Sequence, residues 1–271
     1  MALLRMALVK LARRPATWIV FAILAGLIAV MFLSLGATAG SMESFGDEFQ
    51  IRLLLDFPNA YDLVAGFTVS FGALLGAVLG AAVIGADWAW GTIRTIIARG
   101  ESRVRYTLVT FLAIALVLAV GVVITFIIGT GSALVAANIA GLGTEGASDE
   151  TALREIPELL ARTWLGVTQA AAIGFAIAMV FKSQLAGIGA ALGFYFAEQI
   201  LQLVPGLRDI LIYFPFTVSS SVVATSEELD LSGFESFPVL DADTALLWSF
   251  GYLVIALAIA SFAAWRAQIT Q

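Results

Sequence analysis

The chain has 271 residues, of which 61% are hydrophobic and 13% charged, and its formal net charge is −6. Soluble domains are typically about 45–50% apolar and about 25% charged, so this composition excludes an ordinary water-soluble domain and predicts an integral helical membrane protein. The sequence contains neither cysteine nor histidine, which excludes disulfides, zinc sites built from these residues, iron–sulfur clusters, histidine-ligated haem and acid–base chemistry by histidine.

The first predicted element is an amphipathic helix over residues 1–15. Its apolar stripe repeats at helical spacing and consists of Leu4, Ala7, Leu8 and Leu11. Its cations lie off that stripe and are Arg5, Lys10, Arg13 and Arg14. Such a helix is expected in the membrane interface with its cations near anionic headgroups, and Pro15 suits a bend into the first span. A cleavable signal peptide is the alternative, but the apolar run from Trp18 to Leu35 is too long for one.

Six later stretches are apolar and long enough to cross about 30 Å of hydrocarbon as helices. The predicted spans are 16–38, 61–86, 104–138, 159–181, 184–204 and 243–264. The third exceeds what a bilayer requires, so we expect it to tilt or to end in a broken turn near Gly129 and Gly131. The predicted fold class is an all-α integral membrane protein with six transmembrane helices in one domain, 1–271.

The basic residues divide unevenly between the two sides of this arrangement. With both termini in the cytoplasm, ten bases lie inside, namely Arg5, Lys10, Arg13, Arg14, Arg94, Arg99, Arg103, Arg105, Lys182 and Arg266. Four lie outside, namely Arg52, Arg154, Arg162 and Arg208. This is the positive-inside bias, and it predicts that residues 87–103 face the cytoplasm. The expected location is the prokaryotic cytoplasmic membrane, with several crossings and both termini in the cytoplasm.

The connection at residues 87–103 reads as a short amphipathic helix. Trp88 and Trp90 are expected at the level of the headgroups. Gly91-Thr92 is expected to form a break followed by the N-cap of the short helix, and Gly100 is expected to end that helix. The apolar face consists of Ile93, Ile96 and Ile97, and the cations beside it are Arg94 and Arg99. Ser102 is expected to cap span three. The helix suits docking into a groove of a soluble partner; the alternative is an anchoring loop that only enforces topology.

This connection resembles the cytoplasmic signature of ATP-binding-cassette (ABC) transporter permeases of the ABC-2 type. The matching residues are Asp87, Trp90, Gly91, Thr92, Arg94, Arg99, Gly100, Ser102 and Arg103. Family members more often carry glutamate where this chain has Asp87. The resemblance implies that residues 87–103, with Ile93 and Ile97, form a coupling helix that seats on a nucleotide-binding subunit. It also implies that 1–15 is an elbow helix and that 205–242 holds outer re-entrant or interfacial helices; an outer cap without a transport role is the alternative there.

The function implied is that of a non-catalytic permease subunit, an exporter driven by a separate ATPase. No Gly-x-x-x-x-Gly-Lys-Ser/Thr phosphate loop occurs in the chain, so ATP and Mg are expected on the partner, with no cofactor on this chain. Expected partners are the ATPase, a second permease copy in a homodimer or heterodimer, and membrane lipid, but no nucleic acid. The alternatives are an ATP-independent channel or secondary carrier and, less favoured, a membrane-embedded enzyme.

Two further groups of residues are candidates for packing and for the transport path. Small residues recur every four positions at Gly72, Gly76 and Gly80, and a shorter version occurs at Gly189 and Gly193. They serve packing within one subunit or a subunit interface, and the resemblance favours the dimer interface. The path candidates are Thr68, Ser70, Glu198 and Gln199. Glu198 either lines the path or senses protons, or it is an interfacial acid that reaches outer water.

Overall fold

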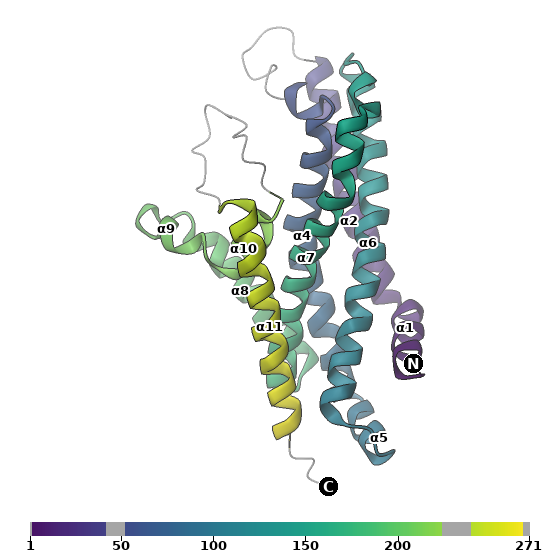
Figure 1. Ribbon diagram of the computed structural model, residues 1–271, viewed down its shortest axis with the longest axis vertical. Coiled ribbons are helices and arrows are strands. Elements are labelled where there is room, and N and C mark those ends of the chain that lie inside the picture. The colour runs from purple at the N-terminus through teal and green to yellow at the C-terminus, as the bar shows by residue number, and fades with distance from the viewer. Residues whose placement is uncertain (1, 42–51, 224–239, 268–271) are drawn as a thin grey trace.

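A computed structural model of the chain describes residues 2–41, 52–223 and 240–267 (Figure 1). Within these ranges every regular element is helical, so the prediction of an all-α chain is confirmed. In chain order the helices are α1 (Ala2–Arg13), α2 (Pro15–Ser41), α4 (Asn59–Ala89), α5 (Thr92–Ala98), α6 (Arg103–Ile139), η1 (Glu145–Ser148), α7 (Glu150–Phe181), α8 (Gln184–Leu201), η2 (Pro205–Leu207), α9 (Arg208–Leu211), α10 (Pro215–Ser221) and α11 (Ala242–Arg266).

Five helices of the described chain are long and apolar enough to cross a membrane, namely α2, α4, α6, α7 and α11. The centre is the pair α4 and α7, whose most apolar windows are 61% and 67% buried, against 22% for both α2 and α11. The outward faces carry large apolar side chains such as Val30, Ile127 and Leu247, which are 67%, 64% and 77% exposed. Faces of this kind need an apolar solvent, as the helices of a multi-pass membrane protein have.

The predicted glycine stripe on α4 faces α7 of the same chain. A Cβ atom added to Gly72 would lie 2.9 Å from Cγ2 of Val167, and one on Gly76 would lie 3.0 Å from the carbonyl oxygen of Val167. A Cβ atom on Gly80 would overlap the carbonyl oxygen of Ala171. The small residues therefore let two backbones of one subunit approach closely. Because α7 occupies this face, these three glycines are not available to a second subunit.

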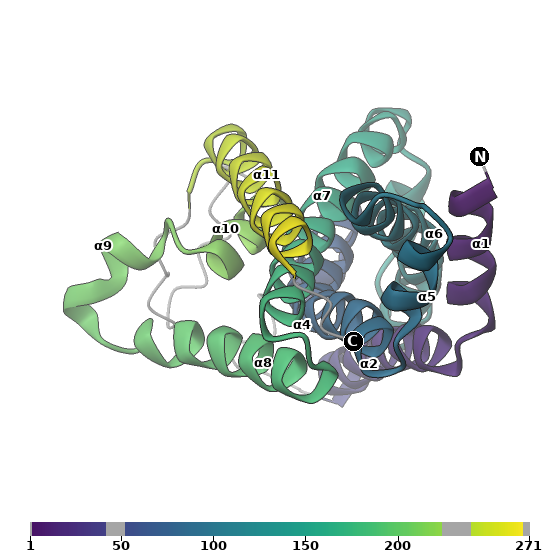
Figure 2. The ribbon, with the colours of Figure 1, turned by 90° about the horizontal axis from the view of Figure 1, so that it is seen from below.

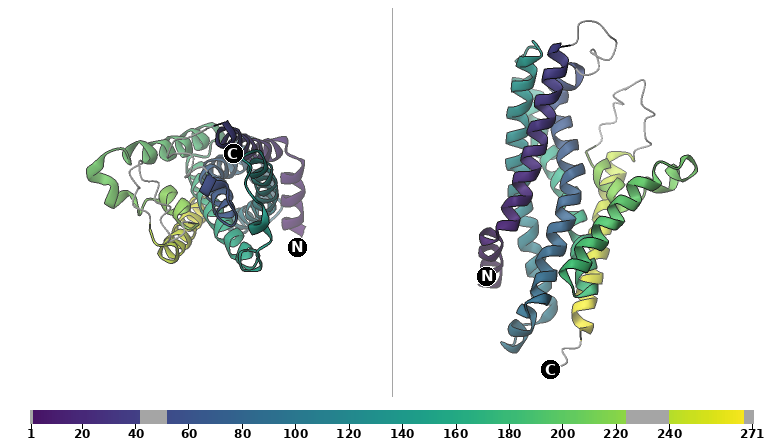
Figure 3. Two further views of the ribbon diagram at one scale, coloured as in Figure 1. Left: turned by 90° about the horizontal axis from the view of Figure 1, so that it is seen from above. Right: turned by 180° about the vertical axis from the view of Figure 1, so that it is seen from behind.

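The fifth predicted span, 184–204, corresponds to α8, which ends at Leu201 and is not among the five spanning candidates. Its 18 residues extend about 27 Å, slightly less than the hydrocarbon core. Figure 3 shows α8 leaving the bundle obliquely toward α9. Polar residues near its end, Glu198 and Gln199, reduce its apolar character. On α8, a Cβ atom added to Gly189 or Gly193 would have no atom of the described chain within 4 Å other than those of its own stretch of helix.

The third predicted span is one continuous helix, α6, so the expected broken turn near Gly129 and Gly131 is wrong. The reason is packing, because a Cβ atom on Gly129 would lie 2.7 Å from side-chain carbons of both Ile28 and Val64. Gly129 thus admits its neighbours without interrupting the helix. With 37 residues, α6 is about 55 Å long and exceeds a bilayer core.

The helix that contains the fourth predicted span is longer than that span, because α7 starts at Glu150 and not at residue 159. Asp149 caps this start, and its carboxylate accepts a hydrogen bond from the backbone N–H of Thr151 at 3.3 Å. The first turns are charged, and so they carry no hydropathy signal. They gain helical support from i,i+4 ion pairs such as Arg154 with Glu150, whose nearest atoms are 2.6 Å apart.

The N-terminal helix α1 packs on the bundle beside α6, and Figure 2 shows α1 along the side of α6 and α5. Its predicted apolar stripe faces the chain itself, with Ala7 and Leu11 only 6% and 1% exposed. Arg5 and Arg13 are exposed, as an interfacial helix requires. The expectation that all four cations reach headgroups is wrong, because Lys10 turns inward to meet an acid of α4.

The predicted outer segment 205–242 is described as far as residue 223 and again from residue 240; residues 224–239 lie outside the described chain. Its described part contains η2, α9 and α10. Helix α10 packs against α4, α7, α8 and α11, and Phe216 and Val218 on it are 2% and 0% exposed. This segment is therefore partly built into the bundle.

Candidate docking site at the connection between α4 and α6

The turn between α4 and α6 is a short helix held between two glycines in the left-handed region. Gly91 has φ 68° and is the N-cap of α5, and Gly100, with φ 85°, follows its C-cap Arg99. Glycine adopts this conformation without the steric cost that other residues carry. The predicted N-cap, Thr92, is instead the first helical residue. Ser102 is the N-cap of α6, but its hydroxyl makes no capping hydrogen bond.

The apolar face of α5 packs against its own chain. Ile93 and Ile96 are 3% and 8% exposed and belong to the main core cluster, and Ile97 is partly buried against it. The expectation that this apolar face enters a partner's groove is therefore wrong for Ile93, and Ile97 offers only part of its surface. The isoleucines instead fix α5 to the end of the bundle.

The outward surface of the connection is cationic with one large aromatic ring. Trp90 is 72% exposed, and Arg94 and Arg99 are exposed as well. The Arg14 guanidinium carbon lies 5.3 Å from the centre of the Trp90 ring, a cation–π arrangement. We call Trp90, Arg94 and Arg99 the α5 surface.

Asp87 is the centre of a buried ionic cluster, so its side chain is not part of the exposed surface of the connection. Its side chain is fully buried, and both carboxylate oxygens lie 2.6 Å from the Lys10 ammonium. The Tyr106 hydroxyl donates to Asp87 at 2.7 Å, and Arg14 approaches Asp87 at 3.4 Å. Lys10 also lies 3.3 Å from the Tyr106 hydroxyl oxygen. We call Lys10, Arg14, Asp87 and Tyr106 the Asp87 cluster.

Sequence reasoning missed Lys10 and Tyr106 as members of this site. Lys10 directly precedes the buried Leu11 on the flank of the apolar stripe, and that position could have indicated an inward-facing cation. Burial lowers the pKa of Lys10 below its usual value, and the nearby Asp87 carboxylate acts in the opposite direction. The ammonium is held close to its counter-ion at the rim of the bundle.

Two other residues of the connection serve contacts within the chain. Arg103 donates to the backbone carbonyl of Ala267 and so joins the start of α6 to the end of α11. The Trp88 ring nitrogen lies 3.0 Å from the Met179 sulfur, and the Lys182 ammonium lies 5.5 Å from the Trp88 ring centre. Neither Arg103 nor Trp88 belongs to the α5 surface, although the sequence placed both near it.

The predicted path residue Glu198 supports α10. It is 1% exposed, and its carboxylate accepts hydrogen bonds from the backbone N–H groups of Phe216 and Thr217 and from the Thr217 hydroxyl. On the other side of the same peptide, the Gln169 amide donates to the Pro215 carbonyl oxygen at 3.1 Å. The expectation that Glu198 reaches outer water is wrong for the described chain, because these donors enclose it.

The other path candidates do not join Glu198. Thr68 is fully buried, and its hydroxyl has no hydrogen-bond partner in the described chain. The Ser70 hydroxyl donates to the Gly66 carbonyl oxygen at 2.8 Å within α4. Gln199 is half-buried beside Glu198. No hydrogen bond links the pair on α4 to the pair on α8 within the part of the chain described.

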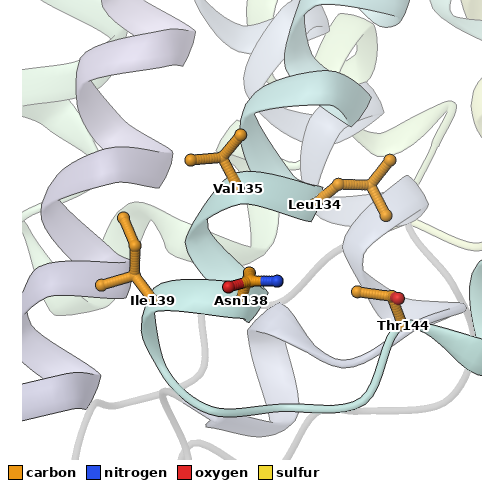
Figure 4. Close-up of a pocket in the computed structure, with 5 residues that line it drawn as sticks. All are labelled: Leu134, Val135, Asn138, Ile139 and Thr144. Atoms are coloured by element: carbon orange, nitrogen blue, oxygen red, sulfur yellow. The ribbon is translucent and has the colours of Figure 1, made fainter.

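A hollow of about 530 Å³ lies near the C-terminal end of α6, far from α5 (Figure 4). Its lining consists of Leu134, Val135, Asn138, Ile139 and Thr144. None of these side chains titrates or serves as a nucleophile with an activating base, so the hollow shows no catalytic arrangement. Among residues 2–41, 52–223 and 240–267, no three His, Cys, Asp or Glu side chains gather as metal ligands would.

Comparison with protein-family models finds a match over residues 27–267 to DUF2705, described as a protein of unknown function. The matched range begins within α2 and ends after α11, so it includes the α5 surface. It does not include α1, which supplies Lys10 to the Asp87 cluster. A search of curated proteins finds no match.

Proposed function

The chain belongs to the DUF2705 family, whose description assigns no function, and we propose that it is the permease subunit of an ATP-driven transporter, an exporter of the ABC-2 type. In this proposal α8 is a sixth crossing beside the five spanning candidates, and the α5 surface docks on a separate ATPase subunit. ATP and Mg belong to that subunit. Two ATPase subunits serve a pair of permeases.

The observation that carries the proposal is the construction of α5. A bare connection between two spans needs only a few polar residues. Here a helix is bounded by Gly91 and Gly100 and is fixed by the buried side chains of Ile93 and Ile96. A rigid helix that presents an exposed indole and cations is pre-organised for binding, which reduces the entropy lost on association.

The proposed orientation rests on the number of crossings and on the position of the basic residues. Six crossings place both termini on the same side, and α1, α5 and the end of α11 lie at the lower end of Figure 1. The bases Arg94, Arg99 and Arg266 lie at that end, which supports a cytoplasmic location by the positive-inside rule. The ATPase, which consumes cytoplasmic ATP, then meets the α5 surface.

The chemistry of the α5 surface indicates the partner's groove. Arg94 and Arg99 are exposed. The acids nearest to them in the sequence already pair with other bases: Asp87 pairs within its cluster, and Glu101 pairs with Arg105 at 3.5 Å. A complementary groove therefore carries carboxylates and an apolar recess for Trp90. Such complementarity steers association and fixes the register of the complex.

Arg94→Glu is expected to reduce recovery of the ATPase with the purified chain by about tenfold, equivalent to ~1.4 kcal/mol, because it places a carboxylate against an acidic groove. The measurement is the amount of ATPase recovered with the purified chain. In native membranes, a photo-reactive amino acid at Thr95 is used in addition to identify the polypeptide that becomes cross-linked to α5. The expected product is a protein with a phosphate-binding loop and ATP hydrolysis. Arg154→Glu is the matched control, because Arg154 is exposed on α7 and its ion pair within the described chain is with Glu150.

Equal recovery from the Arg94→Glu and wild-type chains would refute docking through this surface. A cross-linked product that hydrolyses no ATP would likewise count against the proposal. Transport that survives ATP depletion and follows an ion gradient would replace it with a secondary carrier.

Single-cysteine labelling tests the orientation cleanly, because the native chain has no cysteine. In intact cells a membrane-impermeant maleimide is expected to label Arg154→Cys but not Arg94→Cys. Permeabilised cells should label both, since both positions are exposed. Labelling of Arg94→Cys in intact cells would place the α5 surface outside and exclude a cytoplasmic ATPase as its partner.

A further inference from the structure

We infer that α1 is part of the docking device: the Asp87 cluster locks α1 to the α4–α5 corner, so that α1 moves together with the α5 surface. Lys10 and Tyr106 are then positioning residues for docking. This inference rests on the proposed function.

The cluster lies directly behind the corner that leads into α5. Asp87 is in the last turn of α4, and Trp90 and Gly91 follow it at the break. Its partners come from two other places in the sequence, Lys10 from α1 and Tyr106 from the first turns of α6. Three elements thus meet on one carboxylate within one helical turn of the α5 surface.

The neutralising charge for Asp87 comes from the N-terminal part of the chain. Its bases are Lys10 and Arg14, at 2.6 Å and 3.4 Å. Tyr106 supplies a hydrogen bond but no charge. If α1 moved away, the fully buried carboxylate would lose Lys10, its closest base, and keep only Arg14 at the α1–α2 junction. A buried charge that is only partly neutralised is strongly unfavourable. Helix α1 and the end of α4 are therefore expected to move as one body.

A second contact joins the N-terminal part directly to the α5 surface. Arg14, at the junction between α1 and α2, lies over the ring of Trp90. Its partners are then a buried acid on one side and an exposed aromatic ring on the other. A displacement of Trp90 by a bound partner would be transmitted through Arg14 to the start of α2. A movement of α5 is thus expected to be transmitted to α2, through Arg14, as well as to α4 and α6, to which α5 is directly connected in the chain.

The lock is tested first in the chain alone, in lipid nanodiscs, without any ATPase. Spin labels on the double variant Arg5→Cys, Thr95→Cys report the distance between α1 and α5, both positions being exposed. A single narrow distance distribution is expected. Lys10→Met should convert it to a broad one because it removes the positive charge that α1 contributes, whereas Lys10→Arg should keep it narrow. Tyr106→Phe retains both charges and should broaden it to a smaller degree.

Arg105→Met is the matched control, because Arg105 is an exposed base at the same end that pairs with Glu101 and not with α1. A narrow distribution in Lys10→Met would overturn the inference, as would equal broadening in Arg105→Met. If Lys10→Met does not yield a monodisperse protein, Tyr106→Phe carries the decision by the same criterion.

The second arm measures docking through the photo-reactive residue at Thr95. Lys10→Met should lower the yield of the cross-linked ATPase about tenfold, equivalent to ~1.4 kcal/mol, and Lys10→Arg should restore it. A broad distance distribution with an unchanged cross-linking yield would show that the lock exists but plays no part in docking, which overturns the inference alone. Absence of any ATPase product from the wild-type chain would refute the proposed function together with the inference.

Discussion

Gly80→Ala is expected to lower the stability of the purified chain by about 1–3 kcal/mol, a large effect for one methyl group. The new Cβ atom would overlap the backbone carbonyl oxygen of Ala171, which cannot turn aside as a flexible side chain can. The helices α4 and α7 must therefore separate, and they form the most buried pair of the bundle. The measurement is the thermal midpoint in detergent, followed by size-exclusion chromatography with fluorescence detection.

Gly66→Ala is the matched control on the same helix, because its added Cβ would meet no other part of the described chain within 4 Å. It should leave the midpoint unchanged or raise it slightly, since alanine favours helix over glycine. Gly174→Ala, on α7, would overlap the backbone of Ala77 from the other side of the same contact. The double variant Gly80→Ala, Gly174→Ala should cost less than the sum of the single variants, because the first substitution already separates the helices. Equal midpoints for Gly80→Ala and Gly66→Ala would contradict this description of the contact.

The sequence predicted the existence of most helices, because long apolar runs are unambiguous. It failed where polar residues belong to helices, as in the first turns of α7, where charges pair at i,i+4 spacing and carry no hydropathy signal. It also failed for α6, where Gly129 indicated a break although it serves close packing against Ile28 and Val64. Hydropathy does not separate a glycine that ends a helix from one that admits a neighbour.

The candidate site was predictable in position but not in orientation. The glycines around α5 and the cations on it follow from local sequence, and the structure places Gly91 and Gly100 at the two ends of that helix. Which face of α5 turns inward depends on the end of the bundle, which no local pattern encodes. For the same reason Asp87 could not be distinguished from a surface acid, because its partner Lys10 is 77 residues away in the sequence.

Glu198→Ala is expected to weaken the packing of α10 against α7 and α8, so that α10 detaches from the bundle more often. It removes the acceptor of two backbone N–H groups, those of Phe216 and Thr217, and of the Thr217 hydroxyl. A buried donor left without a partner costs about 1–3 kcal/mol, so the loss for two donors is about 2–6 kcal/mol. Val218→Cys reports the release, because Val218 is fully buried on α10 and the native chain has no cysteine that would also be labelled. Its labelling by a maleimide should accelerate by roughly 30-fold or more, since ~1.4 kcal/mol corresponds to tenfold.

The order of three substitutions separates a specific support from general loosening of the fold. Glu198→Gln keeps one acceptor oxygen, so labelling of Val218→Cys should be slower than in Glu198→Ala. Gln202→Ala removes only the donor to the Thr217 hydroxyl, at 2.6 Å, and leaves that hydroxyl bonded to Glu198, so its effect should be the smallest. If Gln202→Ala accelerated labelling as much as Glu198→Ala, the carboxylate would not be what holds α10. In that case the apolar contacts of Phe216 with Phe194 and Tyr195, whose ring centres lie 5.6 Å and 5.1 Å away, would be the stronger support.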